Sequence, residues 1–213
     1  MSDSPKTLTA QETDLLLQGL LFSGHTHKKN LKGLRNYLIA LLMLDAGLRV
    51  GEVTQLLTTD LWCKNSAVTA LYVRSEIAKG KQERLIPLTR RIQLAIEPVK
   101  LNWWSQSTIE NPWAFTPTPS RLIPLSIRQV ERIIRQASSE SIGREIYPHI
   151  LRHTFASRLM RTTNARVVQD LLGHKRLTST QIYTHPNSED LTNAINSLPN
   201  QKTERTDYVK RNC

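Results

Sequence analysis

The apolar stretch LRNYLIALLMLDAG, residues 34 to 47, constrains this chain more than any other segment. Its apolar run YLIALLML is far shorter than the roughly 20 residues that a membrane span needs, so it predicts a helix of a soluble protein. Gly47 stands where a left-handed residue would end that helix. The N-terminal sequence MSDSPKTLTAQETDLL lacks the charged and apolar regions of a signal peptide, and we therefore expect a cytoplasmic protein without a membrane-spanning segment.

Helical spacing recurs along much of the chain. TLTAQETDLLLQGLLF predicts a first helix, with Thr9 as N-cap and Glu12 completing a capping box. HTHKKNLKG, residues 25 to 33, predicts a basic loop. Further helices are expected to begin near Arg49, to cover residues 90 to 104 and 126 to 140, and to form three short pieces from Pro148 onward.

The pattern of apolar residues changes between residues 59 and 89. Alternating and β-branched apolar residues, broken by the turn sequences KNS and AKGK, predict a small antiparallel sheet of three strands. The expected fold class is therefore α+β, mostly helical with one small three-stranded antiparallel sheet. A chain of 213 residues can bury one good core. We expect one domain over residues 1 to 190 and a C-terminal helix or tail over residues 191 to 213.

The charge balance favours a polyanionic partner. The 29 lysines and arginines exceed the 18 acidic residues, which gives a net charge of +11. Such an excess suits nucleic acid or an anionic membrane surface, and charge alone does not choose between them. Cys63 and Cys213 are far apart and outside any ligand spacing, so we expect free thiols rather than a disulfide framework or a thiolate zinc site.

Two helix starts carry candidate anion-binding residues. In AGLRVGEV, Arg49 begins a helix, and Glu52 lies on the same face, where it can hold the guanidinium. In YPHILRHTFA, the helix begins at Pro148 and places His149 and Arg152 on one face. His149 and His153 also have the spacing of zinc ligands. The following residue is not the glutamate of a metalloprotease, and Arg152 would repel a cation, so zinc is disfavoured.

Three further residues are ambiguous when each is taken singly. Lys79, in EIAKGKQERLIPL, stands in a turn between two expected strands, where a solvated lysine is as common as a functional one. His174 follows Gly173 in LLGH, where a histidine also interacts favourably with the helix dipole. Tyr183, in TSTQIYTH, has a buried core position as its simplest explanation.

Taken in order along the chain, these motifs resemble the tyrosine recombinase family of phage integrases and chromosome-dimer resolvases. The resemblance covers roughly residues 7 to 190. It is carried by Arg49 with Glu52, Lys79 before GKQERLIPL, HILRHTFASRLM, LLGH and TSTQIYTH. Ala78 departs from the glycine that often precedes the family's lysine, and Lys81 follows closely, which makes Lys79 the least secure assignment.

The resemblance implies a DNA-cleaving chemistry. Tyr183 would attack a DNA phosphodiester, become joined to the 3′ phosphate and release a 5′ hydroxyl, so that another strand can reverse the attack without ATP. Arg49 and Arg152 would clamp the non-bridging oxygens, and His174 would add a hydrogen bond. The remaining roles are proton transfer by His149, general acid catalysis by Lys79, and support by Glu52 and His153. No metal or other cofactor enters this scheme.

The resemblance also implies partners and a domain organisation. Double-stranded DNA is the expected partner, bound by a homotetramer at synapsis, with accessory DNA-bending proteins as further candidates and no membrane partner. Larger family members carry an N-terminal core-binding domain, for which this chain leaves no room. In size it resembles the single-domain invertases that switch fimbrial genes, and an excised fragment is the alternative. Two other functions stay open: a type IB topoisomerase, and a DNA-binding accessory protein without chemistry.

Overall fold

The computed structural model describes residues 7 to 22, 27 to 78, 80 to 106 and 111 to 173. Helices dominate this part of the chain, and the expected α+β class is confirmed. In chain order, the elements are α1 (Ala10–Phe22), α2 (His27–Leu44), α3 (Val50–Thr54), α4 (Thr58–Leu61), β1 (Trp62–Cys63), β2 (Ser66–Ala67), β3 (Ala70–Val73), β4 (Arg84–Pro87), α5 (Arg90–Asn102), the short 3-10 helix η1 (Trp104–Gln106), α6 (Ile127–Ile142), α7 (Pro148–Met160) and α8 (Ala165–Leu172).

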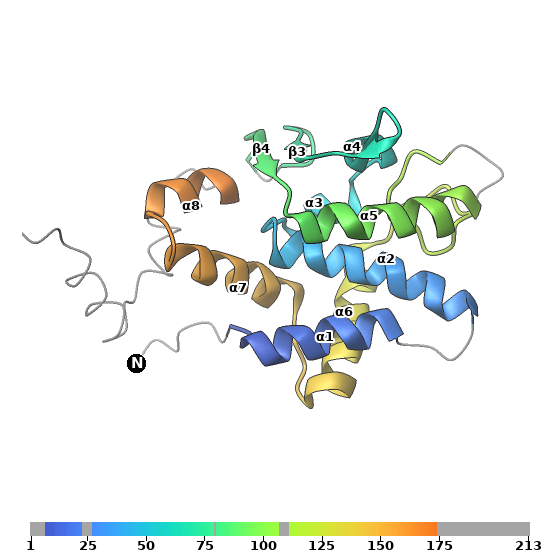
Figure 1. Ribbon diagram of the computed structural model, residues 1–213, viewed down its shortest axis with the longest axis horizontal. Helices are drawn as coiled ribbons and strands as arrows, with labels where there is room; N and C mark the ends of the chain where they lie inside the picture. Colours follow the sequence, from blue (N-terminus) through green and yellow to red (C-terminus); the bar gives the residue numbers. More distant parts are fainter. Residues whose placement is uncertain (1–6, 23–26, 79, 107–110, 174–213) are drawn as a thin grey trace, which may run out of the picture.

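Helix α2 forms the middle of the molecule, between α5 on one side and α1 on the other (Figure 1). Every residue from 38 to 44 is buried, so this part of the helix is covered on all sides. The main core is built around it, with contributions from α1, α3, the β3–β4 pair, α5 and α6. Within the described ranges, no helix has both the length and the hydropathy that crossing a membrane requires.

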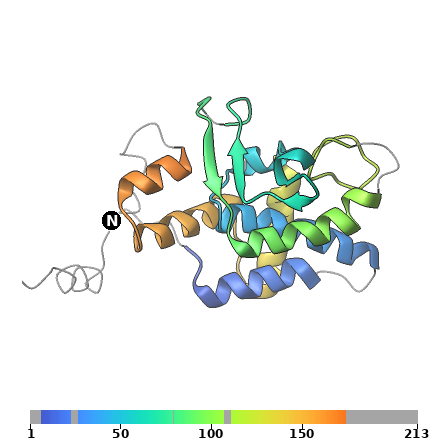
Figure 2. The same ribbon diagram turned by 45° about the horizontal axis from the view of Figure 1, so that its top comes forward.

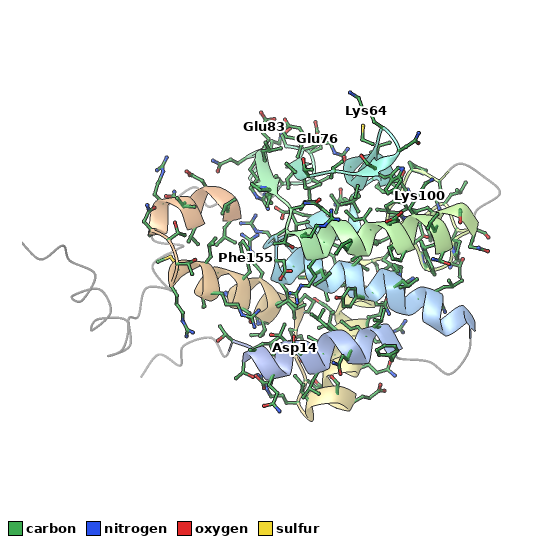
Figure 3. All side chains as sticks on the ribbon, viewed as in Figure 1. Asp14, Lys64, Glu76, Glu83, Lys100 and Phe155 are labelled. Atoms are coloured by element: carbon green, nitrogen blue, oxygen red, sulfur yellow. The ribbon has the colours of Figure 1, made fainter. Side chains whose placement is uncertain are left out.

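Several helix boundaries lie where the sequence predicts them. The amide of Thr9 donates to Glu12 Oε2 at 2.9 Å, and the amide of Glu12 donates to Thr9 Oγ1 at 3.1 Å, which confirms the capping box of α1. Gly47 follows α2 with φ +64°. A Cβ atom there would lie 2.4 Å from Cδ1 of Phe155, which is labelled in Figure 3, so both the backbone and the packing require glycine.

The prediction of a basic loop over residues 25 to 33 is wrong from residue 27 onward, because α2 already begins at His27. The reason lies in the packing of α1 against α2. A Cβ atom on Gly33 would lie 2.3 Å from the carbonyl oxygen of Leu21. Gly33 therefore lies inside α2, where the absence of a side chain lets the backbones of α1 and α2 come close together. In the sequence alone, the same glycine is typical of a loop.

The strands also differ from the expected single sheet of three. They pair as two separate antiparallel ribbons, β1 with β2 and β3 with β4. The turn residues Lys64 and Asn65 both have positive φ, which closes β1 and β2 into a tight hairpin of its own. In the second ribbon, Val73 is opposite Arg84, and the strands are joined by residues 74 to 83 rather than by a tight turn. This second ribbon projects from the helical body beside α8 (Figure 2).

Helices α7 and α8 share a small apolar cluster apart from the main core. Its buried members are Ala156, Val168 and Leu172, with Phe155 among the half-buried side chains around it. Helix α8 begins with Asn164 as N-cap, whose side chain accepts from the amide of Val167. The first two of the three helical pieces expected after Pro148 are thus present, and the third lies outside the described residues.

The pair between Glu12 and Arg144 makes stability depend on pH. The hydrogen bond from Arg144, helped by the amide of Thr9, lowers the pKa of Glu12 from 4.5 to about 2. Because the folded pKa is depressed, this contribution is complete above pH 4.5 and is lost as the pH falls towards about 2. We expect Glu12→Gln to lower the free energy of unfolding by roughly 1 kcal/mol at neutral pH and by much less near pH 2, as measured by denaturant titration.

The matched control is Glu145→Gln. Glu145 pairs with Arg135 at 2.6 Å, and the two side chains are 51% and 43% exposed. An exposed pair contributes less, so this variant should change stability less at neutral pH. A Glu12→Gln effect that is the same at both pH values would contradict the assigned pair.

Candidate functional site

The buried carboxylate of Glu52 is the centre of the candidate site. Glu52 lies on α3 and is 1% exposed. Arg49 is the N-cap of the same helix, and its amide donates to Glu52 Oε2 at 2.8 Å. Its Nη1 donates to Glu52 Oε1 at 3.0 Å. The expected pairing of Arg49 with Glu52 is therefore present, and the carboxylate orients both the backbone and the side chain of the arginine.

Arg84, on β4, binds the same carboxylate. Its Nη1 donates to Glu52 Oε1 at 3.0 Å, and its Nη2 donates to Oε2 at 2.7 Å. Each carboxylate oxygen therefore accepts one hydrogen bond from Arg49 and one from Arg84. With its oxygens engaged in this way, Glu52 serves as a fixed anion that holds cations in place.

Arg152, on α7, completes the group. Its Nη1 lies 4.0 Å from Glu52 Oε2 and donates to the carbonyl oxygen of Gly47. Its Nη2 donates to the carbonyl oxygen of Leu172 at 2.7 Å. The side chain thus joins the ends of α2 and α8 to the carboxylate. The structure therefore brings Arg152 to Arg49 and Glu52, although it is far from both in the sequence.

The charges around Glu52 determine its ionisation. Burial alone would raise the pKa of this carboxyl, but the hydrogen bonds and charge of Arg84, followed by those of Arg49, outweigh burial and lower it. Glu52 is therefore ionised at neutral pH. The arginines outnumber this one carboxylate, so the group carries a net positive charge.

Arg49 presents the most accessible cation of the group. Its side chain is 24% exposed. Among the described residues, none accepts a hydrogen bond from its Nε or Nη2. One edge of the guanidinium is held by Glu52, and the other can donate two parallel hydrogen bonds to an oxyanion.

The two histidines of α7 meet edge to face near its N-terminal end. His149 is exposed, and its ring lies 5.9 Å from that of Tyr147 and 5.7 Å from that of His153. Burial, followed by the nearby charges of His149 and Arg152, lowers the pKa of His153, which favours a neutral ring. His149 is thus the solvent-facing histidine of the pair, whereas His153 is half-buried behind it.

Three predicted site residues, Lys79, His174 and Tyr183, lie outside the described residues. The positions beside two of them are described. The amide of Lys81 donates to the carbonyl oxygen of Ala78 at 3.0 Å. Gly173 caps α8 with φ +61°, as expected for the residue that ends this helix before position 174. The roles predicted for these three residues remain predictions.

Arg84 belongs to the site, although no motif in the sequence predicted it. One signal was available in the sequence. Arg84 alternates with Ile86 along an expected strand, which puts a charged side chain on the same face as an apolar one. A buried arginine requires an anionic or carbonyl partner, so its position pointed to an ion pair whose partner the strand pattern does not identify.

Comparison with known sequences places the chain in a family. The model described as "Phage integrase family" matches residues 7–190. A tyrosine recombinase of Pseudothermotoga lettingae is 34% identical over 171 residues, which cover 79% of this chain and 56% of that protein. Tyrosine recombinase XerC of Pseudomonas fluorescens is 30% identical over 197 residues, covering 91% of this chain and 60% of that protein. The chain thus spans little more than half the length of these relatives.

Comparison with solved structures agrees with this placement. The crystal structure of XerA recombinase has a TM-score of 0.72 and 27% identity, over 92% of this chain and 64% of that one. A XerH site-specific recombinase bound to palindromic difH substrate, in a post-cleavage complex, has a TM-score of 0.67 and 25% identity, over 92% of this chain and 54% of that one. The match over residues 7–190 includes Arg49, Glu52 and Arg152, and this chain belongs to the phage integrase family of tyrosine recombinases.

Proposed function

We propose that this chain is a site-specific DNA recombinase of integrase, invertase or resolvase type, acting through a covalent 3′-phosphotyrosyl intermediate. The observation that carries the proposal is the convergence of Arg49, Arg84 and Arg152 on the buried Glu52. Cations fixed in this way need not reorganise when negative charge develops on a phosphate. The relative XerH is described bound to its difH substrate both before and after cleavage, which supports DNA as the substrate class.

In the proposed reaction, the Tyr183 hydroxyl oxygen attacks the phosphorus atom of a DNA phosphodiester. A bond forms between that oxygen and phosphorus, and the bond from phosphorus to the 5′ oxygen breaks. Lys79 protonates the departing 5′ oxygen, and His149 assists removal of the tyrosine proton. Attack by the 5′ hydroxyl of another strand reverses these steps and exchanges partners, since the phosphotyrosyl bond conserves the energy of the broken one.

Arg49 and Arg152 are proposed to bind the two non-bridging oxygens. The accessible edge of Arg49 supports this role, as does the network of carbonyl and carboxylate contacts that holds Arg152. His174 adds a further hydrogen bond to the phosphate. Glu52 and His153 support the arginine and histidine beside them. Fixed cations supply the positive charge in this scheme, so no metal or other cofactor takes part in it.

The proposed partners follow from the charge and the family. A net charge of +11 suits binding to double-stranded DNA, the substrate that also implies a cytoplasmic location. Strand exchange involves two duplexes, and we propose a homotetramer at synapsis, with accessory DNA-bending proteins as further candidates. A type IB topoisomerase would form the same kind of adduct but relax supercoils without exchanging partners. A DNA-binding accessory protein would form no adduct.

The central test is Tyr183→Phe. The substitution removes only the nucleophilic hydroxyl, so DNA binding should survive while the adduct that resists SDS disappears. DNA trapped by the wild-type protein is sequenced first, and nicked duplexes of the recovered sequence then serve as substrate. Tyr208→Phe is the control and should leave adduct formation unchanged. An adduct that persists in Tyr183→Phe would place the nucleophile elsewhere.

A second prediction concerns the phosphate clamp. Arg49→Lys keeps the charge but loses the planar fork, so single-turnover cleavage should fall by roughly 10²- to 10³-fold. DNA affinity, measured by fluorescence anisotropy, should change far less. Arg144→Lys is the control, since Arg144 also forms an ion pair, with Glu12 at 2.8 Å, but lies away from the site. Equal losses of cleavage and affinity in Arg49→Lys would make Arg49 an ordinary DNA contact.

The segment after Tyr183 is proposed to act in trans. Leu191, Ala194, Ile195 and Leu198 have helical spacing in the sequence, and so short a helix needs a docking surface. Docking on a neighbouring protomer would link the position of the nucleophile to assembly. Deleting residues 187 to 213 should then leave binding to a single site intact while weakening synapsis, as measured by native gel mobility. A truncated protein that assembles and recombines normally would refute docking in trans.

A further inference from the structure

Arg84 makes more contacts with the candidate site than a surface arginine of a hairpin would. Its side chain is 5% exposed, and all three of its nitrogen atoms donate to protein acceptors. Two of them form a fork on Glu52, and Nε donates to the carbonyl oxygen of Leu171 at 2.9 Å. A guanidinium held in this way is buried against the protein, so Arg84 positions other groups rather than binding substrate.

The second contact of Arg84 lies at the C-terminal end of α8. The last carbonyl groups of a helix have no partner within the helix. Here the carbonyl oxygen of Leu171 accepts a hydrogen bond from Arg84, and that of Leu172 accepts one from Arg152. The next residue is Gly173, and a Cβ atom built there would lie 3.2 Å from both Cδ and Nη1 of Arg84. The end of α8 therefore rests directly on this arginine.

We propose that Arg84 is a positioning residue of the recombinase site, fixing Glu52 and the C-terminal end of α8 relative to each other. Through Glu52 it determines the position of Arg49, and through Leu171 it determines where the chain leaves α8 towards His174. This inference rests on the proposed function. It assigns a positioning role to β4, because Arg84 on this strand connects Glu52 to the C-terminal end of α8.

The energetics favour a positioning role over a purely stabilising one. A buried ion pair contributes little net stability, since desolvation of both charges offsets most of their attraction. The two parallel hydrogen bonds from Arg84 to Glu52 nevertheless fix both the distance and the angle between the two groups, which a single point charge would not do. A displacement of about 1 Å in a catalytic group is enough to reduce a rate about a hundredfold. Loss of Arg84 should therefore reduce cleavage much more than DNA affinity.

The test uses Arg84→Met in the full chain, with nicked duplexes of the DNA sequence that the wild-type protein captures. Single-turnover adduct formation should fall about a hundredfold while DNA affinity stays within about threefold. Arg84→Lys retains a charge that reaches Glu52 but loses the simultaneous contact with Leu171, so it should recover part of the rate. It also carries the test if Arg84→Met does not fold. Arg91→Met is the control, because Arg91 forms a similar fork on Asp45 at an exposed position of α5.

The pH profile distinguishes positioning from mere structural support. Within the described part of the chain, the charged groups that face Glu52 are Arg49 before α3, Arg84 on β4 and Arg152 on α7. Removing Arg84 removes the main influence that lowers the pKa of Glu52 against the effect of burial, so that pKa rises. Cleavage by Arg84→Met should then be lost at a higher pH than in the wild type as the solution is acidified between about pH 9 and 5.

The two proposals fail in different ways. A wild-type protein that forms no adduct refutes the recombinase function itself. A wild type that cleaves, together with an Arg84→Met variant that cleaves equally fast, refutes only the role of Arg84. Parallel losses of affinity and cleavage, or an unchanged acid limb of the pH profile, would also overturn it, since they would mean that Arg84 acts through the general stability of the domain.

Discussion

A carboxylate removed from water needs cations around it, and the site is organised around that requirement at Glu52. Its arginine neighbours come from the start of α3, from β4 and from α7. Losing one partner of a buried pair leaves an uncompensated charge, which is strongly destabilising. The packing of these elements is thus limited to arrangements that bring their guanidinium groups to one point.

Local signals in the sequence were sufficient to predict most helix boundaries. The capping box of Thr9 and Glu12, and the cap at Gly47, depend on residues that are near neighbours in the chain. Contacts between distant segments were harder to predict. Gly33 was predicted to lie in a loop, because the close approach of the α1 backbone that requires a glycine there is not visible in the local sequence. The strands were expected in one sheet, because alternation predicts a strand but not its partner.

The same distinction applies to the candidate site. Arg49 and Glu52 are three residues apart, and helical spacing was enough to predict their contact. Arg152 was predicted from its motif, whereas its carbonyl partners at Gly47 and Leu172 were not. Arg84 was missed altogether because its carboxylate lies 32 residues earlier in the chain, on another element. A motif identifies residues that act on substrate more readily than residues that hold those residues in place.

The small apolar cluster between α7 and α8 has a consequence for local opening. Helix α2 is buried within the main core, whereas α8 contributes two buried apolar residues, Val168 and Leu172, to the small cluster and accepts hydrogen bonds from arginines at its final carbonyl groups. Elements with few buried apolar contacts open at lower free energy than the core. Amide hydrogens of α8 should therefore exchange with solvent through a local opening while those of α2 stay protected.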